Sequence, residues 1–86
     1  MRKKRNISGA QIRKFRTLNN MSQSDLAAAC QRAGWNVSRD VIASIESRSR
    51  ILGDAEIVFL AKILRVTILD IFPDRIDAKD VGNIIQ

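Results

Sequence analysis

The sequence lacks the residues on which many metal and catalytic sites depend. It contains no histidine and a single cysteine, Cys30, among 86 residues. A zinc site built from cysteine and histidine therefore cannot form within one chain, and neither can a Ser-His or Cys-His catalytic pair. The four glycines do not cluster into a phosphate-binding loop. We expect no enzyme activity, no catalytic residues, no metal and no cofactor, and we interpret Cys30 as a small buried hydrophobe rather than a redox centre.

Paired carboxylates and membrane-binding segments are also missing. Asp54 and Glu56 are too close in sequence to approach a substrate from opposite sides, and their position favours interaction with a helix dipole. No apolar run approaches the ~20 residues of a spanning helix, and no segment pairs a basic face with a large aromatic one. The basic N-terminus is not followed by the apolar stretch of a signal peptide. We expect a cytoplasmic protein with no membrane partner.

Positive charge is abundant and lies mainly in the first half of the chain. Lys and Arg outnumber Asp and Glu by 15 to 9, which gives a net charge of +6. Residues 1–50 hold eleven bases and three acids, a balance of +8, whereas residues 51–86 hold four bases and six acids, a balance of −2. Such a basic half predicts a polyanionic partner. Because the chain has three Phe, one Trp and no Tyr on which unpaired bases could stack, RNA ranks below duplex DNA.

Apolar periodicity and capping residues predict an all-α chain of five short helices. The first is expected at about residues 10–19, where Ile12, Phe15 and Leu18 recur at helical spacing. The apolar positions of the four later helices are Leu26, Ala27 and Cys30, then Ile42 and Ile45, then Ile57, Leu60, Ala61 and Leu64, then Leu69 and Phe72. The residues assigned to helix starts and stops are Asn19 and Asn20, Ser22 with Asp25, Gly34, Ser38, Gly53 or Asp54, Thr67 and Pro73.

Residues 21–46 have the pattern of a helix-turn-helix. Two helical segments each begin with a serine cap, Ser22 and Ser38. The second segment carries a polar stripe opposite Ile42 and Ile45. An α-helix fits the major groove of DNA, where side chains near its N-terminus reach base edges. The stripe consists of Arg39, Asp40, Ala43, Ser44 and Ser47.

Further positions across residues 9–73 fit the same assignment: Arg16, Ser22-Gln23, Leu26-Ala27, Val37-Ser38-Arg39, Ile42, Ile45-Glu46, residues 60–66 and residues 69–72. In this order and spacing they resemble the phage repressor-like helix-turn-helix family of the Cro/cI or XRE type. The resemblance implies a five-helix lambda repressor-like domain that binds double-stranded DNA sequence-specifically, with no small-molecule ligand. It implies a transcriptional repressor that occupies a pseudo-palindromic operator as a homodimer. Residues 28–36 exceed the common form by roughly one helical turn, which should prolong the second helix, place Trp35 as a packing residue in the turn, and alter the base register.

Four side chains of the third helix are expected to face bases. Arg39, at a position where the family reads bases, is suited to a bidentate contact with guanine, the alternative being a solvated arginine. Asp40 either accepts from a cytosine amino group or stabilises the helix N-terminus. Ser44 lies one turn further along the same face, and Ala43 offers a methyl contact to thymine.

Phosphate contacts are expected at the first turn of the second helix and around both ends of the third. Gln23 occupies the family's phosphate-contacting position, where free backbone N–H groups also favour an anion. For the basic residues 2–5 we expect a general electrostatic contribution, with a defined groove contact and a solvated run as equal alternatives. The flanking residues expected to position the protein on phosphates are Ser38, Ser47, Arg48 and Arg50.

Arg16 and Glu46 are expected to form a structural ion pair. At the matching family positions an arginine and a glutamate can join the first helix to the end of the third. The alternative is two independent surface charges. As a bridge, the pair would fix the recognition helix without necessarily adding stability.

We divide the chain into a basic arm at 1–8, a helix-turn-helix domain at 9–73 and a tail at 74–86. The tail ends with Val81, Ile84 and Ile85, more apolar residues than a solvated tail requires, which favours a dimer contact over a frayed end. The alternative function is a protein-interaction module, such as an antitoxin that binds a partner protein and binds DNA secondarily. A toxin-binding segment normally needs more chain than this tail supplies.

Overall fold

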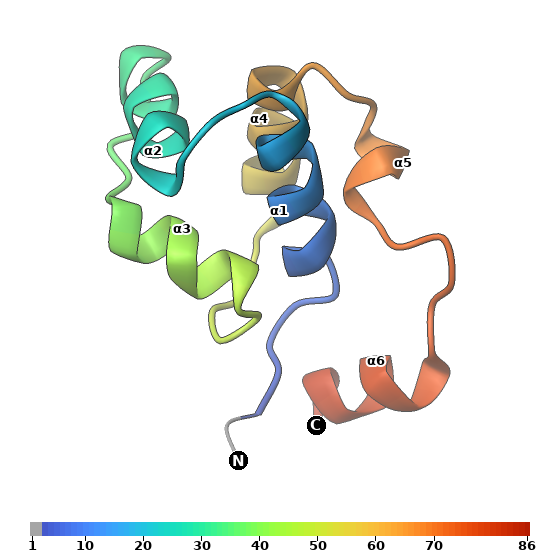
Figure 1. Cartoon of the computed structure of the whole chain (residues 1–86). Helices are drawn as coiled ribbons and strands as arrows, with labels where there is room; N and C mark the ends of the chain where they lie inside the picture. The colour runs from blue at the N-terminus through green and yellow to red at the C-terminus, as the bar shows by residue number, and fades with distance from the viewer. Residues whose placement is uncertain (1–2) are drawn as a thin grey trace.

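The computed structural model describes residues 3–86, which form six α-helices and no strand. The helices are α1 (Gly9–Leu18), α2 (Gln23–Arg32), α3 (Arg39–Glu46), α4 (Asp54–Leu64), α5 (Ile68–Ile71) and α6 (Ala78–Ile85). The prediction of an all-α fold is confirmed, and α6 is an addition to the five helices expected. In Figure 1, α1 and α4 occupy the centre, α2 and α3 lie on one side of them and α5 on the other. Residues 1 and 2 of the basic arm lie outside the described residues.

Side-chain caps begin three of the helices at the predicted residues. The Ser22 hydroxyl accepts from the Asp25 N–H at 2.9 Å, and the Asp25 carboxylate accepts from the Ser22 N–H at 2.8 Å. Thr67 caps α5 in the same reciprocal way. Ser38 caps α3 by accepting from the Val41 N–H at 3.2 Å. These caps satisfy backbone donors that a helix N-terminus leaves without partners.

The connection from α2 to α3 places Trp35 in the turn as a packing residue, as predicted. The helix reaches Arg32 and is followed by Gly34 with φ +110°, a conformation that glycine adopts without steric cost. Trp35 then packs edge-on against Phe59 of α4, with the ring centroids 5.6 Å apart. The turn is therefore attached to the core by an aromatic pair.

The core lies between α1 and the four helices that follow. Cys30 is fully buried there as expected, and burial raises the pKa of its thiol to about 11. Two residues that were predicted to face the core are exposed instead: Leu18 is 67% exposed and Leu69 is 81% exposed. Since α5 makes about one turn, it directs one fully buried side chain inward, and that side chain is Ile71. The buried apolar residues are Ile12, Leu26, Ala27, Cys30, Val37, Ile42, Ile45, Leu60, Ala61, Leu64 and Ile71.

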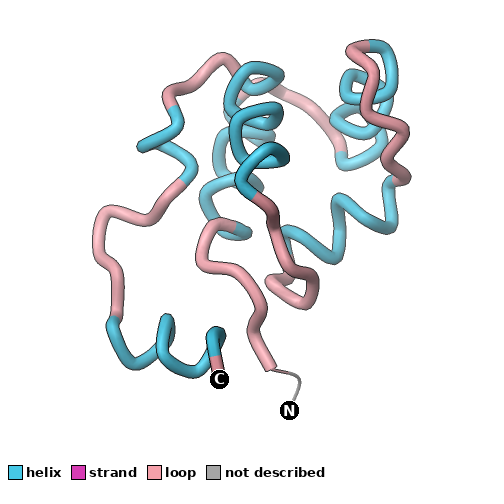
Figure 2. The backbone as a smooth tube through the Cα atoms, turned by 180° about the vertical axis from the view of Figure 1, so that it is seen from behind, coloured by secondary structure: helices cyan, strands magenta, loops and turns pink. Residues whose placement is uncertain are grey.

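The C-terminal helix α6 packs against the N-terminal segment and the edge of the core. Figure 2 shows this helix apart from the other helices, with the C-terminus close to the N-terminal segment. Val81 and Ile84 line a pocket of about 170 Å³ together with residues of the arm and α4 and with Phe72, which follows α5. No residue of α6 is fully buried. Across residues 3–86, no helix is long and apolar enough to cross a membrane.

Candidate nucleic-acid interface

Helix α3 exposes the polar stripe that the sequence predicted. Its inner face is formed by Ile42 and Ile45, which are fully buried. On the outer face the Arg39 and Asp40 side chains are 60% and 89% exposed and form an ion pair with an N–O distance of 3.2 Å. The Ser44 hydroxyl donates to the Asp40 carbonyl at 3.0 Å, one turn back along the helix. The four residues proposed for base contacts, Arg39, Asp40, Ala43 and Ser44, thus lie on adjacent turns and none is buried.

An ion pair from α1 holds the C-terminal turn of α3. The Arg16 Nε lies 2.6 Å from one Glu46 oxygen, and Nη2 lies 2.9 Å from the other. Nη1 of Arg16 also donates to the Met21 carbonyl at 2.7 Å, so the guanidinium connects three segments. The side chains are 12% and 3% exposed. Hydrogen bonding to Glu46 raises the pKa of Arg16, against the opposing effect of burial.

Gln23 faces the same carboxylate. Its Nε2 donates to the Glu46 Oε1 at 3.1 Å, and its side chain is half-buried. Arg16, Gln23, Ala43 and Ser47 help to line a pocket of about 290 Å³, which also includes Arg13. The exposed Arg13 was not predicted, since it lies on the polar side of an amphipathic helix and nothing distinguishes it there from a solvated base.

The N-terminal segment binds the other side of the same turn, through Asn6. This side chain is 7% exposed, and its Nδ2 donates to the carbonyls of Ile45 at 3.1 Å and Arg50 at 2.8 Å. Its Oδ1 accepts from the N–H groups of Ser8 at 3.0 Å and Gly9 at 2.9 Å. Asn6 therefore caps the start of α1 and the end of α3 together. The sequence analysis did not identify it, although an Asn shortly before a helix is a known capping signal.

Gly9 allows α1 to approach the end of α3 closely. A Cβ atom at this position would lie 2.5 Å from the Ile45 carbonyl oxygen and 2.7 Å from that of Glu46. Both atoms belong to backbone, which cannot move aside without shifting the recognition helix. Only glycine fits this contact.

The residues expected to flank α3 have different surroundings. Ser38 and Ser47 are exposed at the two ends of the helix. Arg48 donates from Nε to the Asn6 carbonyl at 2.6 Å and forms an ion pair with Asp80 of α6. Arg50 forms a bidentate pair with Glu56, at 3.0 and 2.9 Å. The two arginines are thus bonded within the chain, with side chains 25% and 34% exposed.

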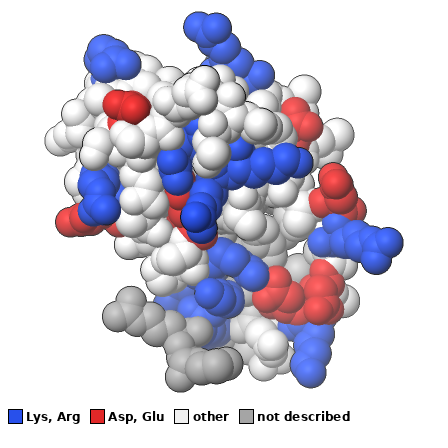
Figure 3. Space-filling model, in the orientation of Figure 1, with Lys and Arg blue, Asp and Glu red and all other residues white. Residues whose placement is uncertain are grey.

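Basic side chains continue beyond α3 onto the N-terminal segment. Figure 3 shows Lys and Arg side chains over this segment and the loop after α3, with acidic side chains gathered near α6. A pocket of about 860 Å³ opens there, beside α3 and on the side away from Gln23. Its lining residues are Lys3, Arg5, Ser44, Ser49, Arg50, Ile51, Gly53 and Glu56.

The exposed stripe on a buried, capped helix, within five packed helices, defines a helix-turn-helix DNA-binding protein. A model of the XRE-type helix-turn-helix family matches residues 12–71, and the chain belongs to this family. The chain is similar to the crystal structure of the restriction-modification controller protein C.AhdI from Aeromonas hydrophila, with a TM-score of 0.65 and 25% identity. The match covers 74% of this chain and 86% of that one. No curated protein sequence matches the chain. The protein is a DNA-binding transcriptional regulator.

Proposed function

We propose that this regulator is a repressor, which occupies a pseudo-palindromic operator as a homodimer and inserts α3 into the major groove of each half-site. The main support for this proposal is the polar face of α3, which is exposed opposite two fully buried isoleucines. The C-terminal turn of the helix is held by Arg16, Asn6 and the close approach of Gly9. A fixed helix reduces the entropy lost on binding. Dimers of this type bind half-sites about 34–36 Å apart, one turn of DNA.

Arg39 is the proposed reader of guanine. Its ion pair with Asp40 is exposed to solvent, and such pairs contribute little, so breaking it on binding costs little. Asp40 is then free to accept from a cytosine amino group. Ser44 and Ala43 extend the contact by a further turn, with a hydroxyl and a methyl group respectively.

Phosphate contacts complete the proposal. Gln23 and Ser38 lie near the N-terminal ends of α2 and α3, and Ser47 lies at the C-terminal end of α3. Arg48 and Arg50 are also proposed to contact phosphates, although each is paired with a carboxylate of the same chain. A guanidinium has five donors, and each of these side chains is partly exposed. These contacts fix the register of the protein on DNA without reading sequence.

Selection of bound duplexes from a random DNA library tests the proposal. Wild-type protein should enrich two inverted half-sites, and Arg39→Ala should weaken binding to the selected site by about 1–3 kcal/mol while relaxing preference at one base pair. The matched control is Arg32→Ala, which removes an exposed arginine from the end of α2. Equal weakening on every sequence would make Arg39 a phosphate contact. If no motif is enriched, the protein-interaction module becomes the better interpretation.

A further inference from the structure

We propose that Lys3 and Arg5 form, with Arg50, a second phosphate site beside α3, which binds one phosphodiester of the DNA backbone across the groove from Gln23. The inference rests on the proposed function, because it takes α3 to lie in the major groove. It assigns a defined ligand to the N-terminal segment.

The backbone of this segment is held in place. The Arg5 N–H donates to the Arg48 carbonyl at 2.8 Å, and the Arg48 Nε donates back to the Asn6 carbonyl at 2.6 Å. Lys4 adds a bond from Nζ to the Ser47 carbonyl at 3.2 Å, at the C-terminus of α3. Each contact involves the turn that follows the recognition helix. Binding therefore does not have to order a free arm, which lowers its entropic cost.

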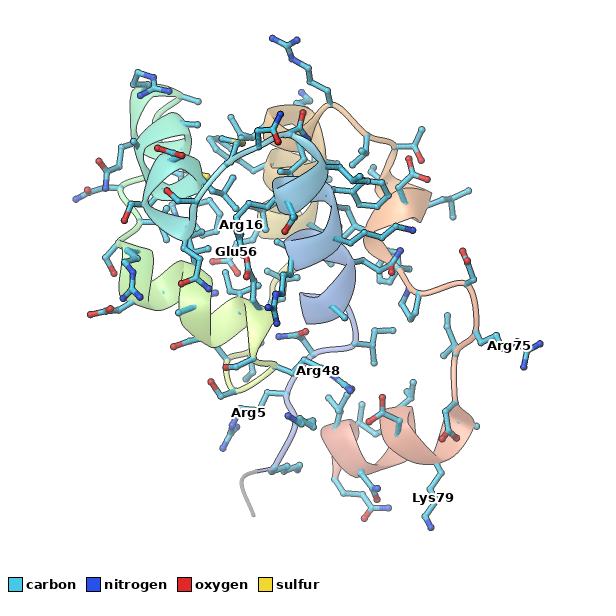
Figure 4. All side chains as sticks on the ribbon, in the orientation of Figure 1. Arg5, Arg16, Arg48, Glu56, Arg75 and Lys79 are labelled. Atoms are coloured by element: carbon cyan, nitrogen blue, oxygen red, sulfur yellow. The ribbon has the colours of Figure 1, made fainter. Side chains whose placement is uncertain are left out.

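The side chains at this position remain available to an anion. Arg5 is exposed beside the loop after α3, as Figure 4 shows. Lys3 is also exposed and bonds the Gln86 carbonyl, which leaves two of its three donors free. The pocket contains three bases and one acid, Glu56, whose charge is balanced by Arg50. Its surplus positive charge suits a phosphate, which arginine can bind with two parallel hydrogen bonds.

The position of the pocket matches the second wall of the groove. Ala43 lines the pocket that contains Gln23, whereas Ser44 lines the pocket that contains Arg5. Successive residues point about 100° apart around a helix, so the two pockets lie on different sides of the face proposed to meet bases. The major groove is about 12 Å wide and is bounded by two phosphate backbones. With α3 in the groove, one backbone faces each pocket.

The salt dependence of DNA binding tests this inference. Arg5→Ala should make the negative slope of log K against log [salt] less steep by about 0.9 and raise the Kd by about fivefold at 0.15 M salt, the value that counterion release predicts for one phosphate. Arg5→Lys should restore most of the slope. Base preference should stay unchanged. The control is Arg75→Ala, an equal loss of charge at an exposed side chain that extends away from α3 in Figure 4, and it should leave the slope near that of wild type.

Duplexes with a single neutral methylphosphonate identify the contact. Wild type should lose affinity at each phosphate that it contacts, and at the one phosphate that lies in this pocket Arg5→Ala should lose clearly less affinity than wild type does. If wild type binds its selected operator but Arg5→Ala keeps the wild-type slope and the same methylphosphonate profile, the inference is overturned and the proposed function stands. If wild type selects no operator, both fail.

Discussion

At the residue scale, Glu46 joins the end of the recognition helix to both α1 and α2. Its two carboxylate oxygens accept from two nitrogens of Arg16 and from Gln23, and only 3% of the side chain is exposed. A carboxylate removed from water this completely needs its partners, because an unpaired buried charge is strongly unfavourable. The pair therefore fixes the position of the α3 terminus relative to α1 and α2.

The two partners of this pair should be energetically coupled. We expect Arg16→Ala or Glu46→Ala to lower the free energy of unfolding by about 3–5 kcal/mol, since each leaves a buried charge unpaired. The double variant should lose less than the sum of the two. Denaturant melts of the four proteins measure this coupling. Strictly additive losses would show that the two charges do not interact.

Whether the role of a residue could be predicted from the sequence depended on whether a known pattern specified its partner. Arg16 and Glu46 could be paired from the sequence because a family pattern specifies both positions. The contacts of Asn6 and Gly9 with the end of α3 could not be predicted in this way. Asn6 donates a hydrogen bond to the Ile45 carbonyl and Gly9 approaches it closely, and Ile45 lies more than thirty positions further along the chain. Periodicity reports which face of a helix is apolar, and it does not report where backbone segments approach each other.

At the element scale, the start of α4 depends on one carboxylate. Glu56 accepts from the Gly53 N–H at 2.9 Å, and also from both Nη atoms of Arg50. The hydrogen bond from Arg50 is the largest cause of the lowered pKa of Glu56, burial opposes it, and the Gly53 N–H adds to the lowering. The loop after α3 and the first turn of α4 are thereby joined.

This arrangement predicts a pH dependence of stability. Because the pKa of Glu56 is lower in the folded state, its contribution is fully present above the unfolded value of about 4.3 and is lost as the pH falls through the folded value. Glu56→Gln should be less stable than wild type at pH 7, and the difference should shrink below about pH 4. Thermal melts from pH 7 to pH 3 measure it. A constant difference across this range would contradict the role assigned to the carboxylate.

Helix α6 shows why not every element could be predicted. The five earlier helices have capping residues and apolar spacing that agree, whereas residues 74–86 follow Pro73 and contain Gly82, which weakens helix propensity. The structure supplies what the pattern lacks. Asp77 caps the helix by accepting from the Lys79 N–H at 2.9 Å, and Val81 and Ile84 are partly buried where they line a pocket with residues of the arm. Short helices depend on such packing.

At the scale of the whole molecule, the C-terminal tail lies against the N-terminal segment and the loop after α3. The tail reaches the loop after α3 through the Asp80–Arg48 pair, and it reaches the arm through the bond between Lys3 and the Gln86 carbonyl. Ile85 nevertheless remains 79% exposed and Ile76 58% exposed. We propose that a second copy of the chain covers these side chains.

Truncation after Asp74 tests this dimer contact. The shortened chain should sediment with a smaller dimer population, and it should lose more affinity for a two-half-site operator than for a single half-site, because only the former requires both subunits. The control is Asp80→Asn, which weakens the pair with Arg48 but keeps the apolar residues of the tail. Unchanged sedimentation and operator affinity would assign dimerisation to another surface, such as the exposed Leu18, Ile68 and Leu69.

Because Cys30 is buried, the reactivity of its thiol can show whether the protein has DNA bound. The thiol is the chain's single sulfhydryl, is fully buried, and resists ionisation because its pKa is raised to about 11. An alkylating reagent can therefore reach the thiolate only when α2 leaves the core. A duplex that binds the folded domain alone raises the free energy of that opening by about 2.7 kcal/mol at a hundredfold excess over the Kd. The rate of alkylation then measures operator binding without any label on protein or DNA.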